Sequence, residues 1–153
     1  MKCKITGEKL NPFMSFGKMP SANGFLEKKD FNNEFFYEME VGFSEKISLL
    51  QPNEFSHPEK VHNERYPFYT SSSRNMQKHF RNFAHWLKDK YLDSSSKLVE
   101  VGSNDGTLLE NFKNTNIEVI GFEPSKTIAE LANKKNIKTL NKFFNIQNIE
   151  DIK

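Results

Sequence analysis

Cysteine is almost missing from this chain of 153 residues, which contains only Cys3. One cysteine cannot form an internal disulfide. It also cannot supply a self-contained cysteine-based zinc site, because such sites need three or four strong ligands. The sequence therefore excludes a fold held together by disulfides, and it argues against a zinc module built on cysteines.

Long apolar runs and an excess of one charge are missing as well. No run approaches the roughly 18 to 20 apolar residues that span a bilayer, and the N-terminus, MKCKITGEKL, has no apolar core of a secretory signal. The 22 basic and 20 acidic residues are interspersed and give a net charge of +2. We therefore expect a cytoplasmic protein that binds neither membranes nor nucleic acid.

Aromatic residues are plentiful, at 13% of the chain with fifteen phenylalanines, which argues against wholesale disorder. Residues 1–72 contain short aromatic or β-branched runs separated by turn residues, the pattern of a small irregular β-rich module. Within it, residues 35–41 predict a strand and residues 46–50 its hairpin partner.

Residues 73–96 predict a linking helix with a short linker after it. Ser73 is a suitable N-cap residue, and apolar residues then recur at spacings of four, three, four and four, as on one face of a helix. These positions are Met76, Phe80, Phe83, Leu87 and Tyr91. His79 and His85 also lie on this helix, and we interpret both as surface or interface residues rather than catalytic ones.

Residues 97–153 alternate between strand and helix patterns. Strands are predicted at 97–102, 117–122 and 137–140, with helices at 107–113 and 127–135. Such a βαβαβ order implies a parallel sheet covered by helices. Three strands leave exposed edges, which proteins normally avoid, so we expect this segment to be the front half of a larger α/β fold.

The loop after the first of these strands carries the strongest chemical signal. Gly102 and Gly106 flank small polar residues between a buried strand and a helix, where glycines let the backbone approach a ligand. The spacing differs from GxGxxG, which disfavours a dinucleotide-binding turn, and from that of a P-loop. A nicotinamide dehydrogenase would also need a third glycine where Thr107 stands.

Glu123 follows the second strand, about 20 residues after the glycine loop, where an acidic side chain can accept hydrogen bonds from both ribose hydroxyls. The alternative is a solvated residue near a helix N-terminus, favoured by the helix dipole. Together with the loop at 102–106, the pattern predicts a nucleoside site that makes no demand for phosphate.

At these residues the sequence resembles a known family. EVGSNDGTLL at 100–109, followed by GFEPS at 121–125, is similar to the cofactor motifs of class I S-adenosylmethionine-dependent methyltransferases. More narrowly, it resembles the sugar C-methyltransferases that act on nucleotide-linked deoxysugars. FGKMPSANGF at 16–25, RYPFYTSS at 65–72 and NKFF at 141–144 continue the resemblance in the family's order, over nearly the whole chain.

The resemblance implies a Rossmann-like fold, S-adenosyl-L-methionine as cofactor and a nucleotide-linked sugar as substrate. It implies that the residues of the glycine loop surround the methionine part of the cofactor, that Glu123 holds the ribose, and that two residues lie near the adenine. Tyr66 and residues 70–73 would come from the small module and close over the site. The loop residues are Glu100, Gly102, Ser103, Asn104 and Gly106, and the adenine neighbours are Pro124 and Phe144.

The chain departs from the family in its N-terminal module, which usually binds zinc through two CxxC pairs. Thr6 replaces the partner of Cys3, and Ser44 and Ile47 replace the second pair. We interpret His57 and His62 as surface residues and predict no metal. The module would then depend on an aromatic core. Its candidates are Phe25, Phe31, Phe35, Phe36 and Phe43.

The second departure is length, because the family's catalytic base and sugar pocket lie beyond the segment that corresponds to these residues. We therefore assign no catalytic residue and expect a truncated or split enzyme. It would bind the cofactor but need a second polypeptide, or act as a homodimer. The alternative is a non-catalytic binding or interaction module, or a truncated remnant.

Overall fold

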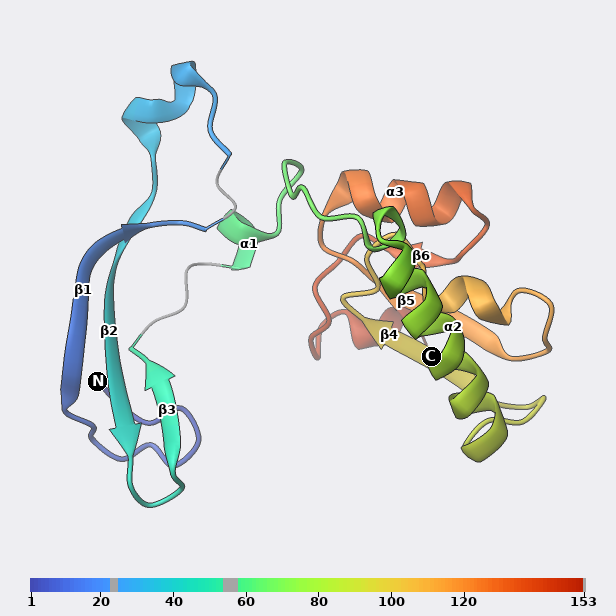
Figure 1. Ribbon diagram of the computed structural model, residues 1–153, viewed down its shortest axis with the longest axis horizontal. Helices are drawn as coiled ribbons and strands as arrows, with labels where there is room; N and C mark the ends of the chain where they lie inside the picture. The colour runs from blue at the N-terminus through green and yellow to red at the C-terminus, as the bar shows by residue number, and fades with distance from the viewer. Residues whose placement is uncertain (23–24, 54–57, 153) are drawn as a thin grey trace. The chain divides into compact units, whose positions relative to one another are not determined.

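The computed structural model describes residues 1–22, 25–53 and 58–152, and the chain forms two compact units, Met1–Val61 and His62–Lys153 (Figure 1). Residues 23, 24 and His57, which the sequence analysis mentions, lie outside the described residues. Segment 62–72, which we expected within the first module, belongs to the second unit. No helix in the described ranges is both long and apolar enough to cross a membrane.

The first unit is built on an antiparallel sheet in the order β1-β2-β3 (Figure 1). β2 (Phe36–Ser44) and β3 (Leu49–Pro52) form the predicted hairpin, with residues 45–48 as its turn. β1 (Pro12–Pro20) was not predicted. Short helical turns lie outside the sheet, η1 at Lys28–Asn33 and α1 at Pro58–Val61.

The predicted phenylalanine core of this unit is wrong. Phe25, Phe31, Phe36 and Phe43 are 62%, 58%, 48% and 44% exposed, and Phe35 is half-buried. The sheet is a single layer with its short helices at the margin (Figure 1), so aromatic side chains on it find little to pack against. Among the described residues of this unit, the buried side chains are Cys3, Leu10 and two polar residues, Ser44 and Gln51.

The second unit is a mixed α/β structure around a parallel sheet in the order β4-β5-β6. The predicted order of strands and helices is confirmed, with a 3-10 turn in place of the helix expected at 107–113. The helix predicted at 127–135 has the expected length, and the other elements are shorter than predicted. The elements of this unit are η2 (Thr70–Ser72), α2 (Arg74–Lys90), β4 (Lys97–Val101), η3 (Leu109–Phe112), β5 (Glu118–Phe122), α3 (Lys126–Lys134), β6 (Thr139–Leu140) and η4 (Ile149–Ile152).

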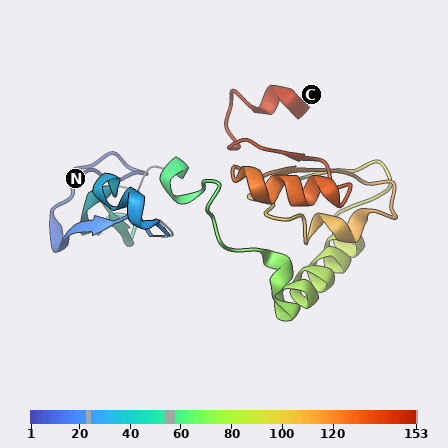
Figure 2. The ribbon, with the colours of Figure 1, turned by 90° about the horizontal axis from the view of Figure 1, so that it is seen from above.

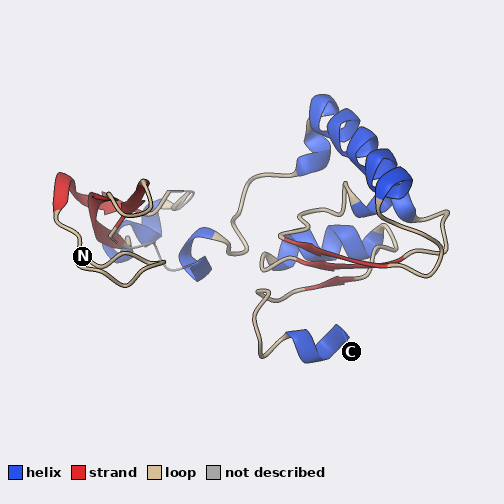
Figure 3. Ribbon diagram, turned by 90° about the horizontal axis from the view of Figure 1, so that it is seen from below, coloured by secondary structure: helices blue, strands red, loops and turns tan. Residues whose placement is uncertain are grey.

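One face of this sheet carries the main core. Ala84 of α2 and Ala132 of α3 belong to buried clusters that share the sheet residues Leu98 and Val119, so both helices pack on the same face. Figures 2 and 3 show the segment after β6 crossing the opposite face. Its Phe144 packs edge-on against Phe122 of β5, with ring centroids 5.1 Å apart.

The helix predicted at 107–113 is only the 3-10 turn η3. Asn111 donates its side-chain amide to the carbonyls of Thr107 and Leu108, and Thr115 donates its hydroxyl to the carbonyl of Phe112. Such local side-chain bonds compete with helical hydrogen bonding.

The mixed α/β class and the parallel sheet are confirmed. A Rossmann-like methyltransferase fold stays a prediction.

Candidate functional site

The loop after β4 lies against the carboxyl end of β5. The amides of Gly102 and Ser103 both donate to the carbonyl of Phe122, at 2.8 and 3.0 Å. The amide of Asn104 donates to Oε2 of Glu123 at 3.0 Å. The two strand ends that the sequence singled out are thus joined by hydrogen bonds.

The Glu123 carboxylate points toward the glycine loop and is only 4% exposed. Its Oε2 accepts from the amide of Asn104, and its Oε1 accepts from the amide of Ser125 at 2.8 Å. A carboxylate offers about four lone-pair sites, so each oxygen retains capacity for one further donor. Glu123 already fixes the loop, and a ribose would have to share its oxygens with these amides.

Glu100 and Ser103 contribute polar atoms that have no partner. Oε2 of Glu100 and Oγ of Ser103 are both buried without a hydrogen bond. Burial, reinforced by the nearby carboxylates of Asp105 and Glu123, raises the pKa of Glu100 to about 8. Buried polar atoms normally find partners, so these two mark a place where a ligand with hydrogen-bond donors and positive charge would be stabilised.

Asp105 is a residue of this loop that the sequence analysis did not single out. It is 1% exposed, accepts from the hydroxyl of Thr107 at 2.6 Å and from the amide of Ser71 at 3.0 Å, and lies 3.7 Å from Nζ of Lys135. Burial alone would raise the pKa of Asp105, but these hydrogen bonds and the lysine charge hold that pKa below its usual range. Its position between two predicted site residues was the available signal.

The two loop glycines serve different needs. Both have positive φ, +70° at Gly102 and +77° at Gly106. A Cβ on Gly102 would meet no atom within 4 Å, whereas a Cβ on Gly106 would lie 2.6 Å from Cδ1 of Ile137. Gly102 therefore leaves open space beside the loop, and Gly106 allows the loop to pack on the core.

The segment before α2 is tethered to both loops. The side chain of Asn104 accepts from the amide of Thr70 at 2.9 Å and donates to the carbonyl of Phe68 at 3.0 Å. The hydroxyl of Ser125 donates to the carbonyl of Asn63 at 2.8 Å. Tyr66 lies between these tethers in sequence and contacts the ring of Phe68, with centroids 5.5 Å apart.

Pro124 and Phe144 both lie near the carboxyl end of β5. The side-chain amide of Asn141 donates to the carbonyls of Glu123 and Pro124, at 3.0 and 2.8 Å. Phe144 packs on Phe122 and is 42% exposed, so part of its ring is free to contact a ligand. The predicted adenine neighbours thus lie at the same strand end as Glu123.

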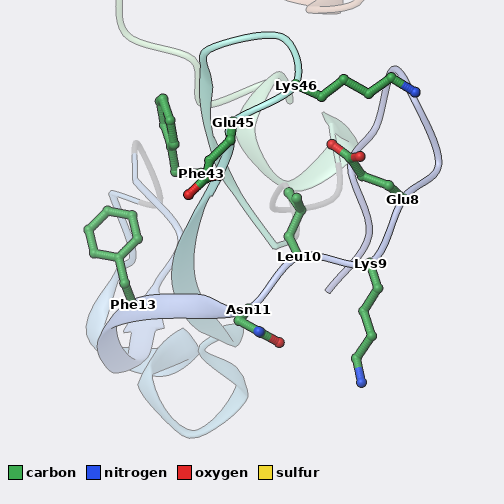
Figure 4. A pocket seen from close by; sticks show the side chains of 8 residues that line it. All are labelled: Glu8, Lys9, Leu10, Asn11, Phe13, Phe43, Glu45 and Lys46. Atoms are coloured by element: carbon green, nitrogen blue, oxygen red, sulfur yellow. The ribbon is translucent and has the colours of Figure 1, made fainter.

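Cavities are present in each unit. One of about 560 Å³ lies in the first unit, where Figure 4 shows Phe13 and Phe43 on one side and Glu8 and Lys46 on the other. A smaller one of about 250 Å³ lies in the second unit and is lined by residues from η2, α2, the loop after β4 and η3. These are Ser71, Gln77, Arg81, Thr107, Glu110 and Asn111.

Two comparisons with known proteins bear on the chain. A family model described as "Putative zinc binding domain" (Methyltransf_13) matches residues 3–62. The C-methyltransferase NovU of Streptomyces niveus is 24% identical over 154 residues, covering 99% of this chain. The chain spans 36% of that relative's length. These matches support a relationship to methyltransferases.

The described residues do not fit the zinc ion that the matched model implies. Sγ of Cys3 accepts hydrogen bonds from the amide of Thr6 and from Nε2 of Gln51, at 3.4 and 3.3 Å. The Thr6 side chain, followed by these two donors, lowers the pKa of the thiol to about 6. Ser44 donates its hydroxyl to Glu8. Within the described ranges, no three His, Cys, Asp or Glu side chains are grouped so that they could hold a metal.

Proposed function

We propose that the second unit binds S-adenosyl-L-methionine and that the chain provides the cofactor-binding portion of a methyltransferase acting on nucleotide-linked deoxysugars. The observation that supports this most is the hydrogen bond between the amide of Asn104 and the Glu123 carboxylate. It brings together a glycine loop and an acidic strand end, the two features that a nucleoside site needs.

Charge favours this cofactor over a nucleotide. Glu100, Asp105 and Glu123 place three carboxyl groups around one loop. Burial raises the pKa of Glu100 most, and the charges of Asp105 and Glu123 raise it further. A phosphate would be repelled by this cluster, whereas an ammonium or sulfonium group would be stabilised. The unpartnered oxygens of Glu100 and Ser103 fit the donors of an ammonium group.

When bound, S-adenosylmethionine supplies an electrophilic methyl group on a positively charged sulfur. The task of the chain is to orient that group and keep water away, since such a transfer depends mainly on alignment and desolvation. Glu123 would hold the ribose, Glu100 and Ser103 the amino acid part, and Phe144 the adenine. The tethered segment at 63–71 would cover the site.

Calorimetric titration of the full chain tests the proposal. We expect S-adenosylmethionine to bind, and Glu100→Gln to weaken binding by about 10- to 100-fold, the cost of losing one charged hydrogen bond. Glu118→Gln, which removes a carboxyl group at the other end of β5, is the matched control and should bind as the wild type does. Equal affinities for all three proteins would contradict the assignment of Glu100.

A non-catalytic interaction module is the second candidate. It is favoured by the exposed aromatic residues of the first unit, since clustered apolar exposure commonly marks a binding surface. Phe13, Phe16 and Phe36 are 61%, 50% and 48% exposed. Absence of binding heat at millimolar S-adenosylmethionine would support this function and reject the first.

A further inference from the structure

Two tight turns meet in the first unit. In the first, residues 3–8, the amide of Cys3 donates to the carbonyl of Glu8 at 2.8 Å and that of Gly7 to the carbonyl of Cys3 at 2.9 Å. The second is the turn between β2 and β3, closed by the pairing of Ser44 with Leu49. The two turns contact one another through the hydrogen bond between Ser44 and Glu8.

Each turn carries a pair of positions three residues apart. They are Cys3 and Thr6 in the first turn, and Ser44 and Ile47 in the second. Structural zinc sites take their ligands from such C-x₂-C pairs, one on each of two facing turns. The backbone therefore has the layout of a zinc module, in agreement with the family model that matches residues 3–62.

The side chains between the turns make hydrogen bonds where a metal would need ligands. Gln51 is 4% exposed, donates from Nε2 to Sγ of Cys3 and accepts from the amide of Lys4 at 2.8 Å through Oε1. Its amide thus joins β3 to the first turn. Because a donor N–H faces the sulfur, that side of the thiol is closed to a cation.

A second bridge crosses from β2. Ser44 is fully buried and donates its hydroxyl to Oε1 of Glu8 at 2.5 Å. Ile47, the remaining position, has no ligating atom and is 37% exposed. Both bridges join residues far apart in the chain, and the Gln51–Cys3 bond is buried while the Ser44–Glu8 bond is partly buried. Hydrogen bonds shielded from water are the most costly to break.

We infer that this unit is a metal-free variant of a zinc-binding domain, in which two side-chain bridges, Gln51 to Cys3 and Ser44 to Glu8, hold the turns that zinc would otherwise join. Structural zinc supplies folding free energy directly. Here that contribution is replaced by hydrogen bonds within a unit whose aromatic residues lie largely exposed. The inference concerns the first unit and does not depend on cofactor binding by the second.

Metal content is the first test. The full chain, expressed in zinc-supplemented medium, should contain far less than one zinc per chain by elemental mass spectrometry. Its amide hydrogen exchange in residues 1–53 should not change when a strong zinc chelator is added. About one zinc per chain, with loss of protection on chelation, would overturn the inference.

The bridges are tested by Gln51→Met, which keeps the length of the side chain but removes its hydrogen bonds. We expect the amides of Lys4 and Thr6 to exchange at least tenfold faster, because their turn loses its anchor. Lys46→Met, an exposed substitution in the second turn, is the control and should leave these amides unchanged. Equal exchange in both variants would show that Gln51 does not hold the turn.

Restoring the ligands tests the ancestry of the site. The triple variant Thr6→Cys, Ser44→Cys, Ile47→Cys should bind one zinc per chain, and its hydrogen exchange should become sensitive to the chelator. A control with three cysteines at the neighbouring positions, Ile5→Cys, Glu45→Cys and Ser48→Cys, should not. Failure of the first variant to bind zinc, or equal binding by both, would overturn the claim that the paired turns are a former metal site.

Discussion

The ionised form of Glu100 lowers the stability of the folded protein. Its pKa is raised from 4.5 to about 8 by burial and by the Asp105 and Glu123 carboxylates. Because the folded-state pKa is higher than the unfolded one, the free energy of unfolding should fall as the pH rises from about 4.5 to 8. We expect Glu100→Gln to remove most of this fall and to stabilise the second unit at pH 8, by on the order of a few kcal/mol.

Thermal or urea unfolding of both proteins between pH 5 and 8.5 measures this difference. Glu118→Gln is the appropriate control, since Glu118 forms a largely exposed ion pair with Lys97 at 3.1 Å. Exposed pairs contribute little to stability, so that variant should follow the wild-type curve. If the free energy of unfolding depended on pH in the same way for wild type and Glu100→Gln, folding would not raise the pKa of Glu100.

The two loop glycines allow a matched comparison. Gly102→Ala should cost about 1 to 2 kcal/mol, because a positive φ is unfavourable for alanine while the space beside it is open. Gly106→Ala adds a Cβ only 2.6 Å from Cδ1 of Ile137, and overpacking contributes about a further 1 to 3 kcal/mol. Urea unfolding measures both, and a smaller cost at Gly106 would contradict this reading of the core.

At this scale the sequence indicated residues by local pattern, although their contacts are distant. Gly102, Asn104 and Glu123 were singled out because glycines and polar or acidic residues at strand ends form such a pattern. Their partners were not predicted: Asn104 bonds to Thr70 and Asp105 to Ser71, each 34 residues earlier. The exposure of Phe31 and Phe43 was also not predictable, since burial depends on what covers a side chain and not on its hydrophobicity.

The side chain of Asn104 makes two hydrogen bonds to the backbone of segment 68–71, one to the amide of Thr70 and one to the carbonyl of Phe68. Asn104→Gly removes both hydrogen bonds, and glycine tolerates the φ of +50° at this position. We expect the amide of Thr70 to exchange several-fold faster with solvent, while amides within α2 stay protected. Unchanged exchange at Thr70 would show that the tether is not what orders the segment.

Elements differ in how clearly the sequence encodes them. α2 has a long apolar period and a cap, confirmed by the hydrogen bond from the amide of Met76 to Oγ of Ser73. η3 also carries buried apolar residues, but Asn111 within it and Thr115 after it donate to backbone carbonyls, which shortens the helix. β1 contains Gly17 and begins and ends with proline, residue types that are unfavourable in strands, yet it pairs along its length with β2.

At the scale of the whole molecule, the chain combines two units with different sources of stability. The second unit has buried apolar clusters between a sheet and two helices. The first has one sheet layer and depends on buried polar side chains. Opening free energies differ between such regions within one protein, so the first unit should unfold at lower urea concentration than the second.

A ligand stabilises the part of a protein that binds it, by about 2.7 kcal/mol at a concentration 100 times its dissociation constant. If the second unit binds S-adenosylmethionine, saturating cofactor should slow hydrogen exchange in the glycine loop and around Glu123 by up to about 100-fold. Exchange in Met1–Val61 should not change, because none of the proposed contacts lies there. Protection confined to the first unit would place the ligand elsewhere, and the 560 Å³ cavity beside Phe43 would then be the site to examine by mutation.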